Sequence, residues 1–119
     1  MTISITTNDN VYIISVSGLI DFFNASELRD EIDALIDKGI VRIIIDLKEV
    51  HFVDSSGIGA FISCSSRLQR LDGSLALVNP QRTVMDVFKM TSIYNYLQIF
   101  DSIEDAKNSL PAKDDTQKG

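Results

Sequence analysis

The fold class is decided by residues 41–59, which read VRIIIDLKEVHFVDSSGIG. The first seven residues are almost continuously apolar and β-branched, which is typical of a strand that is buried on both faces. Such strands occur in sheets that helices cover on both sides. A second apolar patch, Val50 to Val53, leads into residues 54–59, after which apolar residues recur at helical spacing. The segment therefore predicts a buried strand, a turn and a helix.

The sequence before this segment predicts a hairpin and a helix. Apolar residues over 3–16 flank the turn-forming residues 7–10, a pattern that favours two antiparallel strands, and Gly18 closes the second of them. Asn24 is placed to cap the next helix, and Glu27, three residues later, completes the sequence signature of a capping box. The apolar residues that follow recur at helical spacing until a glycine ends the helix.

The sequence after this segment continues the alternation. A short apolar strand over residues 75–78 is followed by Asn79-Pro80, which favours a helix with asparagine as its cap and proline at its first position. A last strand is expected over residues 97–100. Ser102 is then placed to cap a final helix.

The predicted order of elements is therefore β-β-α-β-α-β-α-β-α. Strands that alternate with helices after an initial hairpin indicate a mixed sheet of about four to five strands, with a parallel core and about four helices. The fold class is α/β. We expect one domain over residues 1–110 and a polar, disordered tail over residues 111–119.

Composition and charge exclude several classes of partner and site. The 119 residues carry 11 basic and 17 acidic side chains, a net charge of −6, so neither nucleic acid nor an anionic membrane is expected as a partner. With one cysteine, Cys64, and one histidine, His51, the chain has no multi-cysteine metal site, and no metal or cofactor is expected. No signal peptide is expected, and no apolar run approaches the ~20 residues that span a bilayer. We expect a cytoplasmic protein.

The strongest candidate for a functional site is Asp54-Ser55-Ser56-Gly57-Ile58-Gly59. This segment joins a strand to a helix, so its serines lie at a helix N-terminus, where free N–H groups and the helix dipole favour an anion. An ordinary helix cap has the same composition, and the two roles are compatible. The segment lacks the third glycine of a dinucleotide-binding loop, the Gly-Lys pair of a P-loop and the first glycine of a hydrolase elbow. No enzymatic activity is expected.

Val53 to Gly59 resembles the phosphorylation-site motif of the anti-sigma factor antagonists, which are bacterial STAS domains. Gly18-Leu19-Ile20-Asp21 is similar to a second landmark of that family, a turn before the first helix. The buried strand that ends in Asp46-Leu47 and the junction Leu77-Val78-Asn79-Pro80 match the family in kind and order. The resemblance extends over about residues 3–110 and implies the STAS fold.

This resemblance implies a protein that works by partner switching. In that family the first serine after the aspartate, here Ser55, is phosphorylated by a serine kinase of the histidine-kinase-like ATPase fold, which is often the anti-sigma factor itself. The unphosphorylated antagonist binds this kinase and frees its target, phosphorylation abolishes the binding, and a metal-dependent serine phosphatase restores it. The resemblance implies that Asp21 and Asp54 flank Ser55 and that Ser56 and Gly57 shape the loop that enters the kinase. Leu19 departs from the family, which often has a polar or charged residue there. The expected partner-binding residues are Leu19, Asp21, Phe22, Asp54, Ser56, Gly57 and Ile58.

Alternatives remain for the apolar residues and for the function. Leu19 and Phe22-Phe23 flank Asp21, where they form an exposed binding patch or, for the phenylalanines, pack under the first helix. Ser55 is alternatively only a helix cap, in a STAS adaptor subunit of a larger complex. A small enzyme that binds a nucleotide or phosphate at residues 54–59 is a further alternative.

Overall fold

The computed structural model of the chain describes residues 1–110, apart from the side chain of Tyr94. Its elements are β1 (Thr2–Asn8), β2 (Val11–Ile20), α1 (Ala25–Asp37), β3 (Arg42–Val53), α2 (Ser55–Arg70), β4 (Ser74–Val78), α3 (Arg82–Met90), a 3-10 turn (Ile93–Asn95), β5 (Gln98–Phe100) and α4 (Ile103–Ser109). This order confirms the predicted alternation and the α/β class. The tail expected over residues 111–119 lies outside the described residues.

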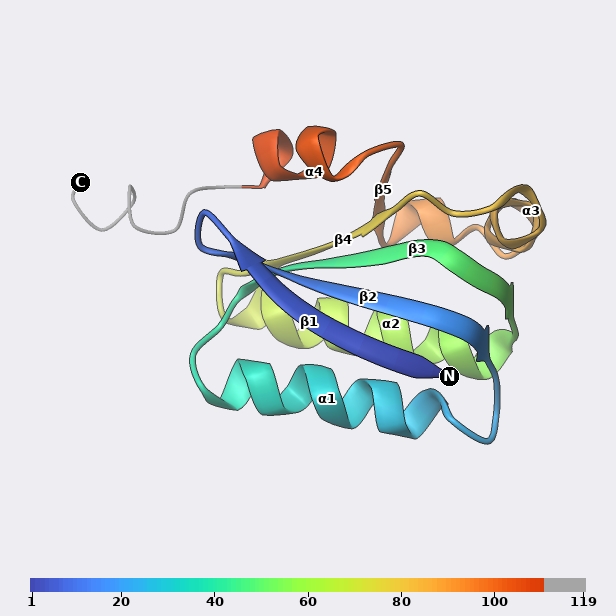
Figure 1. Cartoon of the computed structure of the whole chain (residues 1–119), viewed down its shortest axis with the longest axis horizontal. Helices are drawn as coiled ribbons and strands as arrows, with labels where there is room; N and C mark the ends of the chain where they lie inside the picture. The colour runs from blue at the N-terminus through green and yellow to red at the C-terminus, as the bar shows by residue number, and fades with distance from the viewer. Residues whose placement is uncertain (111–119) are drawn as a thin grey trace.

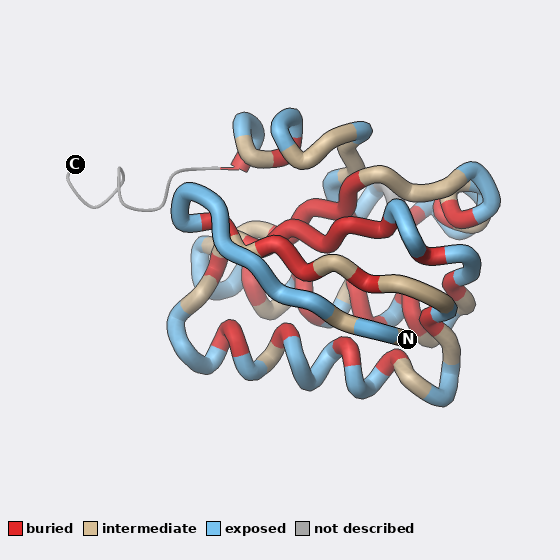
Figure 2. Tube along the Cα trace, viewed as in Figure 1, coloured by how far each residue is buried: buried red, intermediate tan, exposed pale blue. Residues whose placement is uncertain are grey.

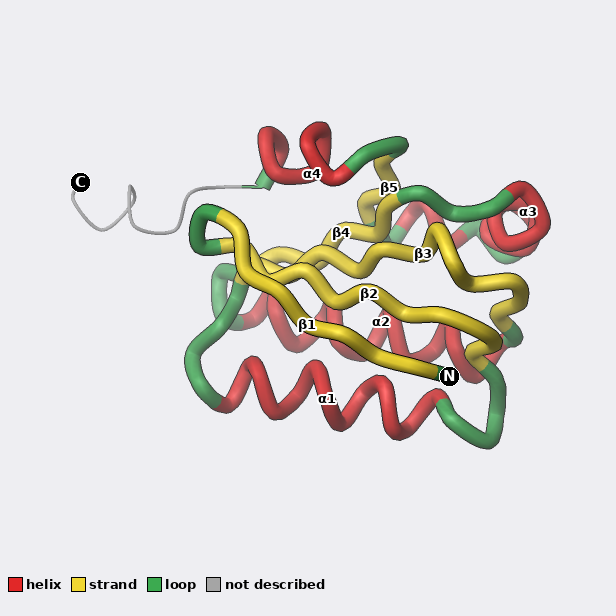
Figure 3. The backbone as a smooth tube through the Cα atoms, in the orientation of Figure 1, coloured by secondary structure: helices red, strands yellow, loops and turns green. Residues whose placement is uncertain are grey.

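The five strands form one sheet in the order β1-β2-β3-β4-β5. β1 pairs antiparallel with β2, whereas β2, β3, β4 and β5 pair in parallel. The hairpin turn is made by Asp9 and Asn10, both with positive φ, as a two-residue hairpin loop requires. Because β2 and β3 are parallel, the connections that follow them lie at the same end of the sheet (Figure 3). These two connections, β2–α1 and β3–α2, carry the candidate site.

Helices cover both faces of the sheet. α1 and α2 lie side by side against one face, and α4 lies against the other (Figure 1). β3 supplies Ile43 and Ile45 to the larger core and Ile44 to the core under α4, and all three are fully buried. Burial of each such side chain stabilises the fold by about 1.5–3 kcal/mol. The strand buried on both faces is therefore confirmed, and Figure 2 shows the contrast with the exposed edge strand β1.

Residues 42–53 form one continuous strand, β3, where the sequence suggested a strand and a separate patch. The strand has an extra residue relative to β2 at two places, so that Ser15 and Ser17 pair with Asp46 and Glu49, and then Gly18 and Leu19 pair with Val50 and Phe52. His51 is the extra residue at the second place. A bulge of this kind breaks the regular alternation of a strand, and here it leaves Phe52 exposed while Val53 is buried.

Gly18 lies inside β2 and does not close it, contrary to the sequence prediction. Its φ is +96°, a conformation that L side chains rarely adopt, and it falls where the pairing of β2 with β3 shifts register. The glycine therefore permits the register shift between β2 and β3 just before the ends of both strands.

The two predicted asparagine caps have different outcomes. Asn24 is the N-cap residue of α1, as predicted, but its side chain forms no capping hydrogen bond, because its Oδ1 accepts from the Asp21 N–H at 2.9 Å and its Nδ2 donates to the Leu19 carbonyl at 2.9 Å. The prediction that Asn79 caps the next helix is wrong. Asn79 takes a left-handed conformation, and its Nδ2 donates to Oδ1 of Asp46 at 3.2 Å. α3 begins later, at Arg82. Neither asparagine side chain caps a helix, and each instead forms hydrogen bonds that hold the preceding chain.

The predicted cap of α4 is confirmed, because the Ser102 hydroxyl accepts a hydrogen bond of 3.0 Å from the Asp105 N–H.

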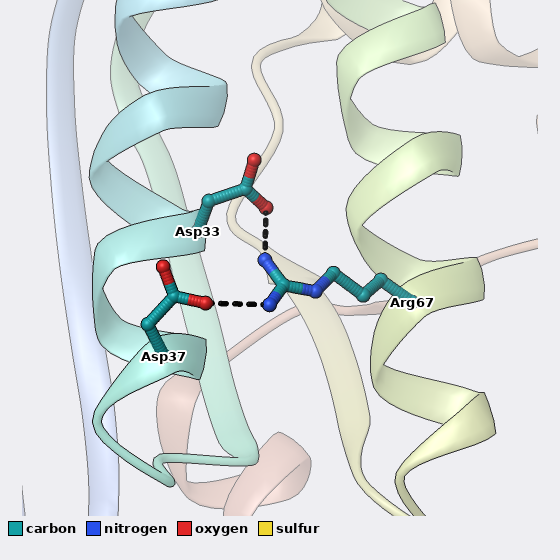
Figure 4. A network of polar contacts seen from close by, with 3 residues as sticks. All are labelled: Asp33, Asp37 and Arg67. Atoms are coloured by element: carbon teal, nitrogen blue, oxygen red, sulfur yellow. Dashed lines mark hydrogen bonds and ion pairs between the residues drawn. The ribbon is translucent and has the colours of Figure 1, made fainter.

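α1 and α2 are also joined by a forked ion pair (Figure 4). The Arg67 guanidinium on α2 donates to Asp33 at 3.0 Å and to Asp37 at 2.6 Å, both on α1. Its hydrogen bonds to Asp37 and Asp33 raise the pKa of Arg67. The ion pair joins the C-terminal halves of α1 and α2, and the other end of α2 carries the candidate site.

Candidate functional site

The candidate site lies at the N-terminus of α2, which begins at Ser55. Asp54 precedes the helix in an extended conformation, and its Oδ1 accepts hydrogen bonds from the N–H groups of Ser56, at 2.8 Å, and Gly57, at 3.1 Å. The cap of α2 is therefore Asp54. Ser55 is exposed, and its hydroxyl forms no hydrogen bond with any other described residue.

The first turn of α2 packs closely against the sheet because residue 57 is glycine. A Cβ at Gly57 would lie 2.7 Å from Cγ1 of Val53 and 2.8 Å from Cγ2 of Ile20, closer than side-chain carbons approach. Gly57 is buried and Ile58 is 7% exposed in the main core, whereas Ser56 is half-buried. The packing of Gly57 and Ile58 against the sheet thus fixes the position of Ser55.

The β2–α1 connection is tied to this helix end by hydrogen bonds. The Asp54 N–H donates to the Ile20 carbonyl at 3.1 Å, and Oδ2 of Asp54 accepts from the Phe22 N–H at 3.0 Å. Within the connection, Oδ1 of Asp21 accepts from the Phe23 N–H at 3.0 Å. The structure therefore brings Asp21, Phe22 and Asp54 together around the start of α2.

Four large apolar side chains are exposed on the segments that meet at this site, and we call them the aromatic edge. Their exposed fractions are 47% for Leu19, 74% for Phe22, 88% for Phe23 and 47% for Phe52. The rings of Phe22 and Phe23 are 5.5 Å apart in a T-shaped arrangement. Packing of these phenylalanines under the first helix is thereby ruled out.

Phe52 is the member of the aromatic edge whose exposure was not predicted from the sequence. It pairs with Leu19 across β2 and β3, so the two side chains lie on the same face of the sheet. Their neighbours Ile20 and Val53 belong to the core under α1 and α2, so Leu19 and Phe52 face away from those helices. An apolar stretch from Val50 to Val53 carries no signal that one of its members is exposed.

Two electrostatic features of the site act in opposite directions on a negative group at Ser55. One is the helix N-terminus, and the other is the pair of carboxylates Asp21 and Asp54. The N-terminus of a helix carries the equivalent of about half a positive charge, which stabilises an anion there. Asp21 and Asp54 take part in no ion pair among residues 1–110, so their negative charges are not neutralised by a neighbouring cation.

Within residues 1–110 no group of three or more His, Cys, Asp or Glu side chains is arranged to hold a metal ion. Cys64 lies inside α2, and burial, followed by the nearby Asp33 charge, raises its pKa from 9.0 to about 12. The thiol is therefore protonated and is a poor nucleophile near neutral pH. No helix in the described part of the chain is long and apolar enough to cross a membrane.

One family model matches most of this chain. Residues 2–106 match the model of the STAS domain. An anti-sigma-B factor antagonist of Bacillus subtilis (strain 168) is 27% identical over 99 residues, which cover 83% of this chain and 90% of that protein.

The same fold is found in solved structures. An anti-sigma factor antagonist from Mycobacterium paratuberculosis has a TM-score of 0.83 at 23% identity, and the match covers 92% of each chain. SpoIIAA of Bacillus matches in its unphosphorylated form with a TM-score of 0.76 at 23% identity over 90% of this chain and 94% of that chain. Its phosphorylated form matches with a TM-score of 0.69 at 23% identity over 90% and 97%. At these identities the likeness shows the fold.

Proposed function

The chain belongs to the STAS domain family, and from this membership we propose that it is an anti-sigma factor antagonist controlled by phosphorylation of Ser55. The unphosphorylated chain binds a serine kinase of the histidine-kinase-like ATPase fold that also restrains a sigma factor or another regulator, and so releases that regulator. Phosphorylation ends the binding, and a metal-dependent serine phosphatase restores it. In this proposal the chain is a binding protein that acts in the cytoplasm and catalyses nothing itself.

The observation that carries the proposal is the exposed hydroxyl of Ser55 at the first residue of α2. Asp54 caps the helix, so Ser55 is not needed as a cap and is free to be modified. The curated relatives are named for the same role, and one solved relative is known in both phosphorylated and unphosphorylated forms.

The partner-binding residues have two kinds of role in this proposal. Leu19, Phe22 and Asp21, together with Asp54, form the surface around the acceptor serine. Ser56, Gly57 and Ile58 are half-buried or buried, so they act by holding the backbone of the loop that enters the kinase.

The switch is electrostatic. Phosphorylation adds about −1.5 to −2 charge at neutral pH. At the helix N-terminus the domain tolerates this charge. In the complex, the kinase surface encloses a neutral Ser55 hydroxyl between Asp21 and Asp54 of this chain. A phosphate enclosed there is repelled by both carboxylates and loses its hydration. A coupling of about 1–3 kcal/mol changes affinity by about 5–150-fold, and close like charges extend that range.

Affinity purification tests the proposal. Wild type, Ser55→Ala and Ser55→Asp are immobilised, and proteins retained from a lysate of the source organism are identified by mass spectrometry. Ser66→Asp is the matched control, because Ser66 is exposed on the same helix but away from its N-terminus. We expect a serine kinase to be retained by all forms except Ser55→Asp and to phosphorylate wild type but not Ser55→Ala.

Aspartate carries less charge than phosphate, so the enzymatically phosphorylated chain is tested beside Ser55→Asp. Equal retention of the same non-kinase proteins by every form would refute the switch and support an adaptor. Turnover of a nucleotide by the isolated chain would support an enzyme.

A further inference from the structure

β1 (Thr2–Asn8) is an edge strand whose outer side has no partner strand. It is the outermost strand of the sheet and pairs with β2 alone, in one continuous register. Among residues 1–110, no backbone hydrogen bond from a turn, a loop or a helix end reaches β1. Every residue of β1 except Ile3 is exposed, as Figure 2 shows along this strand. The N–H and C=O groups that point outward from β1 can therefore pair with another strand.

β1 lacks the features that normally protect an edge strand from pairing. Proteins usually protect exposed edges with charged side chains, prolines, bulges or very short strands. The sequence of β1, TISITTN, contains neither a charged residue nor a proline, and its pairing with β2 has no register shift. The strand at the opposite edge, β5, is by contrast only three residues long. β1 is therefore the edge of this sheet on which a further strand can pair over a useful length.

The sequence of β1 is complementary to itself in an antiparallel arrangement. When a twofold axis through Ile5 relates two copies of β1, the strands overlap along their whole length and Ile5, which is 37% exposed, lies opposite Ile5 of the second copy. A shift of two residues in either direction would shorten the overlap and move the two isoleucines apart. Pairs of β-branched or hydroxyl side chains stabilise a sheet. The other pairs are all uncharged: Thr2 with Asn8, Ile3 with Thr7, and Ser4 with Thr6.

Charge identifies a second copy of the chain as the occupant of this edge. Each copy carries a net charge of −6, so two copies repel one another wherever their charged side chains meet. β1 provides a contact without charged side chains. Asp9, the acidic residue next to β1, is already paired with Lys107 at 3.0 Å. A strand from a basic partner would need acidic side chains for its recognition, and β1 has none.

We propose that the chain forms a weak twofold dimer in which β1 pairs antiparallel with β1 of a second copy and joins the two sheets into one. The association stops at two copies, because both use the same edge and β5 offers an edge of only three residues. A contact through one strand is small, so the dimer forms at high protein concentration. Antiparallel pairing directs the two β2 strands oppositely, so the two Ser55 residues lie at opposite ends of the joined sheet. This inference does not rest on the proposed function.

Sedimentation equilibrium of the whole chain tests the dimer. We expect the mean mass to rise from 13.2 kDa at about 10 μM towards twice that value at about 1 mM, as a weak dimer requires. Ile5→Lys places two positive charges opposite each other and should raise the dissociation constant by at least about tenfold. Thr6→Lys repeats this test at a polar, exposed residue. Ser66→Lys is the matched control, because it adds the same charge on an exposed position of α2, and it should change the constant by less than about twofold.

Disulfide cross-linking locates the twofold axis. The chain's own cysteine, Cys64, is buried and does not compete. In Ile5→Cys the two introduced thiols lie opposite each other, so an added oxidant should join the copies at least about tenfold faster than in Ser66→Cys, which reports random collisions. Ser4→Cys should react as slowly as Ser66→Cys, because residue 4 lies opposite Thr6 and on the other face of the sheet from Ile5.

The outcomes distinguish this edge from any other contact. A mass of 13.2 kDa at every concentration would overturn the proposal. A dimer that persists in Ile5→Lys and Thr6→Lys, with both variants folded by circular dichroism, would also overturn it, because the contact would lie elsewhere. If a lysine variant unfolds, cross-linking of Ile5→Cys decides, since it adds no charge. Salt should strengthen the dimer by screening the repulsion between the copies, and a dimer that salt weakens would be held by ion pairs, contrary to the proposal.

Discussion

The backbone N–H of Phe22 donates a hydrogen bond of 3.0 Å to Oδ2 of Asp54, a residue 32 positions later in the chain. The other oxygen of the same carboxylate accepts from the first turn of α2. One side chain therefore fixes both the start of the helix that carries Ser55 and the loop that carries Phe22 and Phe23.

Replacing Asp54 should destabilise the domain through this double role. Asp54→Ala removes the cap of α2 and the acceptor of the Phe22 N–H, and we expect a loss of about 1–2 kcal/mol, the upper range for an N-cap. Asp54→Asn keeps a capping oxygen and should lose less than half of that. Urea unfolding followed by circular dichroism measures both. A loss of stability as large in Asp54→Asn as in Asp54→Ala would contradict the capping role.

The two glycines of α2 should respond in opposite directions to alanine. At Gly57 the new methyl would lie 2.7 Å from Val53 and 2.8 Å from Ile20, so Gly57→Ala should cost about 1–3 kcal/mol, as overpacking does. At Gly59 a Cβ meets nothing within 4 Å. Gly59→Ala should therefore gain up to about 1 kcal/mol from helix propensity. Thermal unfolding of the pair measures the difference, and the same sign for both variants would refute the close approach of Gly57 to the sheet.

The alternation of strands and helices could be predicted from sequence because each element has its own periodicity. The stretch Val41 to Leu47 predicted a strand buried on both faces, and the structure fully buries its centre, Ile43 to Ile45. The caps were harder to predict, because Asn24 and Asn79 have the composition of caps but bond to Asp21, Leu19 and Asp46 instead. The partner of each asparagine side chain is set by the tertiary structure: for Asn79 it is a side chain 33 positions away, and for Asn24 it is the backbone of the preceding turn.

The candidate site was predictable as a segment but not as a surface. Asp54 to Gly59 has a recognisable motif, whereas the exposure of Phe52 depends on a bulge at His51 that only the pairing of β3 with β2 reveals. The hydrogen bond from Phe22 to Asp54 could not be predicted from the sequence either. It links the β2–α1 and β3–α2 connections, which lie close together because β2 and β3 are parallel.

Stability should fall at high pH because of Cys64. Its pKa is raised to about 12 in the folded chain from 9.0, so the folded state keeps the proton where the unfolded state releases it. The protonated folded form is therefore favoured fully below pH 9, and this contribution is lost progressively between pH 9 and 12. Urea unfolding at pH 8 and pH 10.5 should show a steeper decline for wild type than for Cys64→Ala, in which the thiol is absent. Equal slopes would show that the buried thiol titrates normally.

Phosphorylation of Ser55 should leave the fold intact and change its surroundings only. The phosphate joins the N-terminus of α2, where the helix dipole stabilises an anion by about 0.3–1 kcal/mol. The phosphate is also next to Asp54, whose carboxylate accepts a hydrogen bond from the Phe22 N–H. Amide NMR signals of residues 21–23 and 54–58 should therefore shift, while those of β4 and α4 should not. The matched comparison is Ser66→Asp, which adds charge to the same helix far from the cap. Shifts spread through the whole sheet would mean that the switch works by refolding, not by charge at the surface.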